Sequence, residues 1–127
     1  MVYQSSSLGT EISCVLYNIN AEILNNHRRL EQILLEALTR DNFKILGKLS
    51  HEFQPQGYTC VVLLAESHAA IHTFPEHNSL VFYLYSCRGR DDGWKTFEYL
   101  KQILNPSHID LDVSERQIVL KDTRPGH

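Results

Sequence analysis

A helical stripe between residues 21 and 40 constrains the fold of this chain more than any other feature. In the segment AEILNNHRRLEQILLEALTR the apolar side chains return every three or four residues, which is the spacing of one face of an α-helix. Asn20 precedes the segment and is a suitable N-cap residue. The stripe consists of Ile23, Leu24, His27, Leu30, Ile33, Leu34, Ala37 and Leu38. A helix with one apolar face needs another layer to cover that face, so we expect it to pack on a sheet.

The other apolar segments have the length and composition of β-strands. Strands are expected over residues 11–17, 42–53, 58–67 and 79–87, with 68–74 extended or opening a hairpin and short strands over 107–113 and 115–120. Pro55 and Gly57 mark a turn. A second amphipathic helix is expected over residues 91–104, with Asp91 or Asp92 at its N-terminus. This order predicts an α+β fold, a two-layer sandwich of an antiparallel sheet with two helices on one face.

Composition limits what such a domain can do. With 127 residues and 43% hydrophobic side chains, the chain has the size of one domain and can bury a core. Its net charge of −3 and the lack of a Lys/Arg-rich run argue against nucleic acid as a partner. Because the apolar runs are too short to span a bilayer and the N-terminus does not resemble a signal peptide, we expect one cytoplasmic domain, residues 1–127, with no membrane partner.

The second face of the expected sheet also needs cover. Segments 58–67 and 79–87 are apolar at nearly every position, so both faces of these strands are apolar. Helices on one face alone would leave the other face exposed to water. A homodimer is the simplest assembly that covers it.

The cysteines and the paired histidines do not indicate a metal site. Cys14, Cys60 and Cys87 have no CxxC spacing, so neither a zinc ribbon nor a disulfide framework is expected. His68 and His72 would share one face of a strand, but their neighbours are Ala, Ile and Thr instead of acidic ligands. We therefore expect no metal.

The dipeptide Glu66–Ser67 offers a different chemistry. Ser67 lacks the glycine elbow of a hydrolase nucleophile. A serine can attack its own preceding carbonyl and turn the amide into an ester; removal of its α-proton then expels the ester and leaves dehydroalanine, which hydrolyses to a pyruvoyl group. These steps need a serine, a hydroxyl or amide dipole that steadies the oxyanion, and a histidine that moves protons. Ser67, Thr59 and His72 supply these groups.

Three separated segments carry a family resemblance. ESHAAIHTFPE, residues 66–76, resembles the E-S-H-x-x-I-H-T-[aromatic]-P-E run of the prokaryotic S-adenosylmethionine decarboxylases, which are pyruvoyl enzymes. The upstream FQPQGYT, residues 53–59, resembles their F-x-P-x-G-[hydrophobic]-S element. FYLYSCRGRDDGWKTFEYLK, residues 82–101, resembles their strand ending in T-C-G and the D-P-W-K-A-F-E-Y-L helix after it.

The resemblance implies that the chain is a zymogen. Cleavage between Glu66 and Ser67 would give a β chain, residues 1–66, and an α chain, residues 67–127, so the homodimer expected from the apolar sheet faces would consist of αβ units. Ser67 would become the pyruvoyl cofactor that forms a Schiff base with the substrate amine. His72 matches the histidine that transfers the processing proton, and Thr59 stands where the family usually has the Ser that supports processing.

The resemblance also implies the substrate side of the site. Cys87 matches the general acid that returns a proton to the α-carbon. Phe53 and Phe74 match the positions that stack on adenine, and Glu76 matches the acid that accepts the ribose diol. The implied reaction decarboxylates S-adenosylmethionine, which then donates its aminopropyl group in spermidine and other polyamine biosynthesis.

Some residues depart from the family pattern on the substrate side. Phe74 replaces the common Trp or Tyr, Thr10 and Glu11 stand in place of G-[KR]-H, and Tyr83 stands where an Asp often lies. A pyruvoyl-dependent arginine or ornithine decarboxylase is therefore an alternative, in which Glu11 or Glu76 would face the guanidinium. A non-catalytic regulatory homologue is the second alternative.

Overall fold

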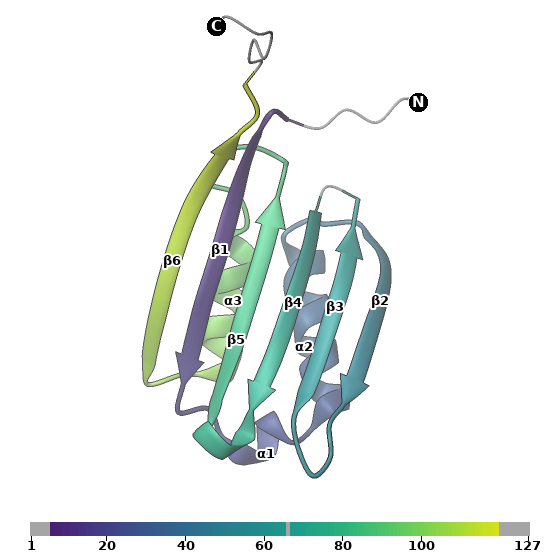
Figure 1. Ribbon diagram of the computed structural model, residues 1–127, viewed down its shortest axis with the longest axis vertical. Helices are drawn as coiled ribbons and strands as arrows, with labels where there is room; N and C mark the ends of the chain where they lie inside the picture. Colours follow the sequence, from purple (N-terminus) through teal and green to yellow (C-terminus); the bar gives the residue numbers. More distant parts are fainter. Residues whose placement is uncertain (1–5, 66, 120–127) are drawn as a thin grey trace, which may run out of the picture.

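Six antiparallel strands form one sheet, and two long helices lie on one of its faces (Figure 1). The structure is a computed structural model that describes residues 6–65 and 67–119. Its elements are β1 (Leu8–Tyr17), α1 (Ala21–Leu24), α2 (His27–Arg40), β2 (Ile45–Glu52), β3 (Tyr58–Leu64), β4 (Ser67–Phe74), the short 3-10 helix η1 (Pro75–His77), β5 (Ser79–Ser86), α3 (Trp94–Leu104) and β6 (His108–Gln117). The expected α+β sandwich is confirmed.

The strand order places β4 and β5 in the middle of the sheet. The order is β2-β3-β4-β5-β1-β6, and every neighbouring pair is antiparallel. The end of β3, the start of β4 and the end of β5 lie at one end of the sheet, whereas η1 and the turn between β2 and β3 lie at the other (Figure 1). Residues far apart in the sequence therefore share each end.

The core lies between the sheet and the two helices. Alternate residues of the strands face the helices and are fully buried; across the sheet they include Ile12, Cys60, Ile71 and Phe82. The helical stripe meets them through Leu24, Leu30, Ile33, Leu34, Ala37 and Leu38, all buried. Asn20 caps the first helix by accepting a hydrogen bond from the Glu22 amide, as expected.

Helical structure over 21–40 breaks into two pieces, unlike the single helix that was predicted. α1 ends at Leu24, and Asn26 starts α2 as a new N-cap by accepting from the Arg29 amide at 3.2 Å. Asn side chains compete for backbone amides in this way, so the pair Asn25–Asn26 favours a restart over continuation. His27 follows the break, and its ring stacks on Tyr58 with the centroids 4.6 Å apart.

Two further predictions were wrong in detail. The two short strands predicted over 107–113 and 115–120 are one strand, β6, paired with β1 along its whole length. Helix α3 begins at Trp94 with Gly93 as its N-cap, and neither Asp91 nor Asp92 occupies that position. Gly93 has φ 93°, and a Cβ there would lie 2.6 Å from Leu84, so a glycine is required.

The face of the sheet opposite the helices is uncovered in the single chain, and we call it the open face. Leu49, Val61 and Leu63 are neighbours on it, with 78%, 40% and 56% of their surfaces exposed. The prediction that β3 is apolar on both faces is therefore confirmed. None of the helices among residues 6–65 and 67–119 has the length and apolar character needed to cross a membrane.

Candidate active site

Five residues predicted for the site line one cavity at the η1 end of the sheet. The cavity has a volume of about 420 Å³. The five predicted residues on its wall are Phe53, Thr59, His72, Phe74 and Glu76, and we call this cavity the His72 pocket. Four segments supply them: the turn after β2, strand β3, strand β4 and η1. The fold therefore assembles them although 23 positions separate Phe53 from Glu76.

Thr59 and His72 form the polar centre of this pocket. They are directly opposite each other in the β3–β4 ladder, and the Thr59 hydroxyl lies 3.0 Å from Nδ1 of His72. Both side chains point to the open face, away from the helices. The pair is thus a hydroxyl hydrogen-bonded to an imidazole on a rigid hairpin, which is a suitable arrangement for steadying an oxyanion and moving a proton.

Two aromatic rings and a carboxylate complete the pocket. Phe53 and Phe74 are 48% and 40% exposed, which is unusual for phenylalanine and leaves both rings available to a ligand. Phe53 is held by His51, whose ring meets it edge-on with the centroids 4.6 Å apart. The sequence analysis did not single out His51, because its position opposite Thr59 is set by the register of β2 and β3. With Glu76 nearby, the pocket suits a flat ring that carries hydroxyl donors.

Ser67 lies at the other end of the sheet, with Cys87. Ser67 is the first residue of β4 and pairs with Ser86, the last residue of β5. Cys87 comes directly after Ser86 in the sequence and therefore lies close to Ser67. The Ser67 hydroxyl oxygen is buried and has no hydrogen-bond partner among the described residues. We call Ser67 and Cys87 the Ser67 end. Glu66, the other half of the predicted cleavage site, lies outside the described residues.

One chain does not bring its Ser67 to its own His72. Five residue steps along β4 separate them, which is about 16 Å in an extended strand. Because that number is odd, their side chains also point to opposite faces of the sheet. The predicted site residues therefore form two groups in one chain, the His72 pocket and the Ser67 end.

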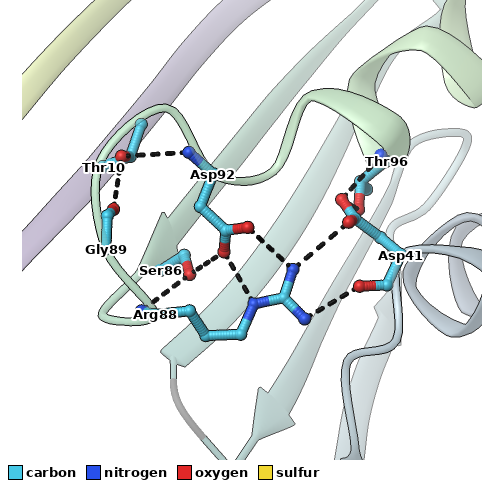
Figure 2. A network of polar contacts seen from close by, with 7 residues as sticks. All are labelled: Thr10, Asp41, Ser86, Arg88, Gly89, Asp92 and Thr96. Atoms are coloured by element: carbon cyan, nitrogen blue, oxygen red, sulfur yellow. Dashed lines mark hydrogen bonds and ion pairs between the residues drawn. The ribbon is translucent and has the colours of Figure 1, made fainter. Parts of the chain in front are cut away.

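A network of polar contacts that the sequence analysis missed surrounds the residue after Cys87. Figure 2 shows the Arg88 guanidinium between two carboxylates. Nε and Nη2 of Arg88 donate to Asp92 at 2.7 and 3.0 Å, and its Nη1 donates to the Asp41 carbonyl at 2.8 Å. Ser86 also donates to Asp92 through its hydroxyl. The guanidinium lies over the Phe43 ring, 3.5 Å from its centroid.

Asp41 explains why α3 needs no aspartate of its own at the N-terminus. Its carboxylate accepts from the Thr96 amide at 2.9 Å and from the Thr96 hydroxyl at 2.8 Å (Figure 2). Thr96 is the third residue of α3, so Asp41, which ends α2, caps the neighbouring helix across the chain. Asp92 is thereby left to pair with Arg88.

The charges in this network hold one another in their ionised forms. Burial by itself would raise the pKa of Asp92, but the hydrogen bonds from Arg88 and Ser86 outweigh it and leave the pKa lowered. Burial would likewise lower the pKa of Arg88, but the hydrogen bond and charge of Asp92 outweigh it, so the pKa is raised. The Arg88–Asp92 pair is therefore ionic at neutral pH.

Asp92→Asn is expected to lower the free energy of unfolding by about 2 kcal/mol at pH 7, because Arg88 loses a charged partner. Since folding depresses the pKa of Asp92, its carboxylate stabilises the fold above the unfolded-state pKa. That contribution is lost as pH falls below about 4 toward the folded-state pKa. Urea unfolding should therefore show that the difference in the free energy of unfolding between wild type and Asp92→Asn is smaller at pH 3 than at pH 7. The exposed neighbour Asp91→Asn is the control, and an equal difference at both pH values would contradict the assignment.

A second polar cluster lies on the open face close to the Ser67 end. The Tyr83 hydroxyl donates to Glu11 at 3.0 Å, and burial, with this hydrogen bond, raises the pKa of Tyr83. His68 lies against Tyr83 and Tyr85, with ring centroids 5.5 and 6.4 Å away. Two positions that depart from the family pattern, Glu11 and Tyr83, are therefore partners of each other.

The remaining cysteines are structural. Cys14 and Cys60 are buried, and burial raises the pKa of both thiols, that of Cys14 to about 12. Cys87 is partly exposed. Within residues 6–65 and 67–119, no three His, Cys, Asp or Glu side chains gather closely enough to hold a metal ion.

Comparison with known proteins decides the family. The sequence profile of the S-adenosylmethionine decarboxylase family matches residues 10–117. The S-adenosylmethionine decarboxylase proenzyme of Sulfurihydrogenibium sp. (strain YO3AOP1) is 35% identical over 113 residues, which are 89% of this chain and 85% of that protein. The proenzyme of Aquifex aeolicus (strain VF5) is 34% identical over 119 residues, or 94% and 88% of the two chains. This chain belongs to the S-adenosylmethionine decarboxylase family.

Solved structures of S-adenosylmethionine decarboxylases have the same fold. The crystal structure of the adenosylmethionine decarboxylase from Aquifex aeolicus VF5 superposes with a TM-score of 0.83 at 32% identity, covering 94% of this chain and 99% of that one. The Trypanosoma brucei AdoMetDC-delta26 monomer superposes with a TM-score of 0.60 at 15% identity, over 82% of this chain and 45% of that one. The second likeness concerns the fold alone.

Proposed function

We propose that this chain is a pyruvoyl-dependent S-adenosylmethionine decarboxylase that cleaves itself between Glu66 and Ser67 into a β chain, residues 1–66, and an α chain, residues 67–127. The observation that carries the proposal is the His72 pocket, which joins a hydroxyl–imidazole pair, two exposed phenylalanines and a carboxylate in a member of this family. The product would be the aminopropyl donor for spermidine synthesis.

The residues at the Ser67 end fit a pyruvoyl group. Ser67 has a buried hydroxyl with no described partner, so no hydrogen bond needs to be broken before it attacks the preceding carbonyl. Its position at the start of a strand leaves the new chain end fixed by the β4–β5 ladder. A pyruvoyl group at this position supplies a carbonyl that condenses with the substrate amine and takes up the electrons released with CO₂.

The chain's own residues would then divide the work. In processing, the Thr59 hydroxyl steadies the oxyanion and His72 removes the α-proton of Ser67. In turnover, Cys87 holds the proton that returns to the substrate α-carbon. Phe53 and Phe74 stack on the adenine and attract the sulfonium, while Glu76 accepts hydrogen bonds from the ribose.

Two copies of the chain are needed to complete this site. Ser67 and His72 of one chain are about 16 Å apart, which is far beyond the reach of a proton transfer. Packing two open faces together about a two-fold axis that runs across the strands reverses the strand direction of one sheet. The Ser67 end of each copy then lies over the His72 pocket of the other, and two equal sites form. Because the Ser67 side chain points to the helix side of its own sheet, it is the backbone at the start of β4 that faces the partner's His72.

The surface of the open face supports this assembly. The same axis sets β2 and β3 of one copy against β2 and β3 of the other, so the exposed Leu49, Val61 and Leu63 meet an equally apolar surface. We therefore propose a homodimer of αβ units. A cytoplasmic location, which was expected from the sequence, stays a prediction for cell fractionation to test.

Mass spectrometry and CO₂ trapping test the function directly. The purified protein, denatured, should give two fragments that divide at residue 66, with the α chain blocked at its N-terminus. The cleaved protein should release labelled CO₂ from carboxyl-labelled S-adenosylmethionine. Release from arginine or ornithine alone would replace the proposed substrate with the alternative, and a single uncleaved chain without activity would favour a regulatory homologue.

Leu63→Lys should convert the dimer into a monomer, because it places a charge among apolar side chains that the partner covers. The monomer should stay uncleaved, because its Ser67 has no partner His72. Analytical ultracentrifugation gives the mass, and gel electrophoresis gives the cleavage. Ile118→Lys is the control, because Ile118 is 77% exposed but lies beyond the end of β6. A monomer that still cleaves itself would exclude the two-copy site.

A further inference from the structure

Cys87 lies between Ser86 and Arg88, two residues of the polar network in Figure 2, which we call the Arg88 network. Ser86 is fully buried, and its hydroxyl both donates to Asp92 and accepts from the Arg88 amide at 3.2 Å. Arg88 itself is held by both carboxylates of the network. The backbone on each side of Cys87 is therefore fixed by contacts that do not involve its thiol. The Cys87 carbonyl is also held, by the Ser6 amide at 3.1 Å.

The network ties the segment after β5 to three other elements. Asp41, whose side chain is 8% exposed, attaches it to the end of α2, and through Thr96 to α3 (Figure 2). Thr10 of β1 donates to the Gly89 carbonyl at 2.8 Å and accepts from the Asp92 amide at 3.3 Å. A segment held in this way has one conformation, although it contains two glycines and a surface arginine.

The family motif described above has glycine directly after the cysteine, whereas this chain has Arg88. A glycine could make none of the four guanidinium contacts that Arg88 makes to Asp41 and Asp92. The bridge from Arg88 to Asp41 and Asp92 is therefore a feature of this chain. Its place beside Cys87, the predicted proton donor, connects it to the reaction.

We propose that Arg88 is a positioning residue, which bridges Asp41 and Asp92 and thereby aims the Cys87 thiol at the substrate α-carbon. This inference rests on the proposed function. Arg88 does not touch the substrate; it acts through the backbone of Cys87.

The chemistry makes the aim of the thiol measurable. After CO₂ leaves, its electron pair is shared between the substrate α-carbon and the former Cα of Ser67. A proton on the substrate carbon, followed by hydrolysis with one water, releases the amine product and restores the pyruvoyl carbonyl. A proton on the other carbon, followed by the same hydrolysis, leaves the nitrogen on the protein as an N-terminal alanine and releases an aldehyde. A misplaced thiol therefore raises the yield of alanine per turnover.

Arg88→Gln in the full-length, self-cleaved protein is the first test. We expect normal cleavage, a fall in kcat of about tenfold and a rise of about tenfold in alanine-capped α chain per CO₂ released. Edman sequencing detects only the α chains that begin with alanine, because an α chain capped by a pyruvoyl group has no free amine and is not sequenced. Arg88→Lys should have a kcat and an alanine yield between those of wild type and Arg88→Gln, since an ammonium cannot bridge both carboxylates as a planar guanidinium does. The matched control is Arg90→Gln on the same segment, where the arginine side chain is 63% exposed and pairs with Glu115 at 3.4 Å.

A second test needs no pyruvoyl group. In a Ser67→Ala background, the rate at which iodoacetamide alkylates Cys87 reports the position of the thiol, because Cys14 and Cys60 are buried. Arg88→Gln should raise this rate about threefold, and Arg90→Gln should leave it unchanged. Asp92→Asn, which keeps the shape of its side chain, should raise it as well and serves if Arg88→Gln does not fold.

The two tests separate the inference from the proposed function. A wild-type chain that stays uncleaved overturns the function, while the alkylation rates still decide whether Arg88 fixes Cys87. An alanine yield and an alkylation rate that match wild type in Arg88→Gln would overturn the inference, and so would equal changes in Arg90→Gln.

Discussion

Ser67→Ala chains are expected to remain whole and to release no CO₂, because no hydroxyl is left to attack the preceding carbonyl. The effect should be complete, since both the cut and the cofactor arise from that one oxygen. Mass spectrometry of the denatured protein should find the full chain of 127 residues. The fold should persist, because the Ser67 hydroxyl makes no hydrogen bond to a described residue whose loss would destabilise it.

Ser114→Ala is the matched control for Ser67→Ala. Ser114 lies on β6, is partly exposed and is opposite Glu11 in the sheet. This variant should cleave and turn over like wild type. If Ser67→Ala protein that is folded and uncut released CO₂ from S-adenosylmethionine, the pyruvoyl mechanism would be wrong for this chain.

Co-expression of Ser67→Ala and His72→Ala chains should restore the cleavage that each variant lacks alone. In a mixed dimer, Ser67 of the His72→Ala chain lies over the intact His72 of its partner and is cut. With equal amounts and random pairing, about half of the His72→Ala chains should be cleaved, and none of the Ser67→Ala chains. Different affinity tags on the two chains let electrophoresis tell them apart.

The control for this experiment pairs His72→Ala chains with the double variant Ser67→Ala, His72→Ala. No intact His72 is then present, so no cleavage is expected. If co-expression of the two single variants also gave no cleaved chain while mixed dimers were present, Ser67 would be served within its own chain. Strand β4 would then have to leave the sheet for processing, because its ladder holds Ser67 and His72 about 16 Å apart.

The two-copy arrangement changes how the departures from the family pattern are understood. Glu11 and Tyr83 are hydrogen-bonded to each other on the open face, two strands and one strand away from β4. They lie on the surface that the partner would cover, on the same side of the sheet as His68. The CO₂-trapping experiment with labelled substrates therefore tests these two positions as well. If the substrate were arginine or ornithine, the cation near Glu11 and Tyr83 would be a guanidinium or an ammonium instead of a sulfonium.

Local patterns in the sequence were enough for the fold class and for most of the elements. The stripe from Leu24 to Leu38 requires a layer beneath it, and the alternation in β3 and β5 provides that layer, because periodicity is fixed by backbone geometry alone. The break at Asn25–Asn26 was missed, since capping by the Asn26 side chain competes with helix continuation, and hydrophobic periodicity does not record that competition.

The sequence by itself predicted the chemistry from a serine after a glutamate, a histidine five residues later, a cysteine at a strand end and two aromatic residues beside an acid. Only the tertiary structure decided where these groups lie. It put Thr59 and His72 in one pocket, kept Ser67 at the opposite end of the same strand, and brought Asp41 to Arg88 across 47 positions. The physical reason is that neighbours in a strand are held apart by its rise of about 3.3 Å per residue, whereas contacts between distant segments depend on how the whole sheet and its helices pack.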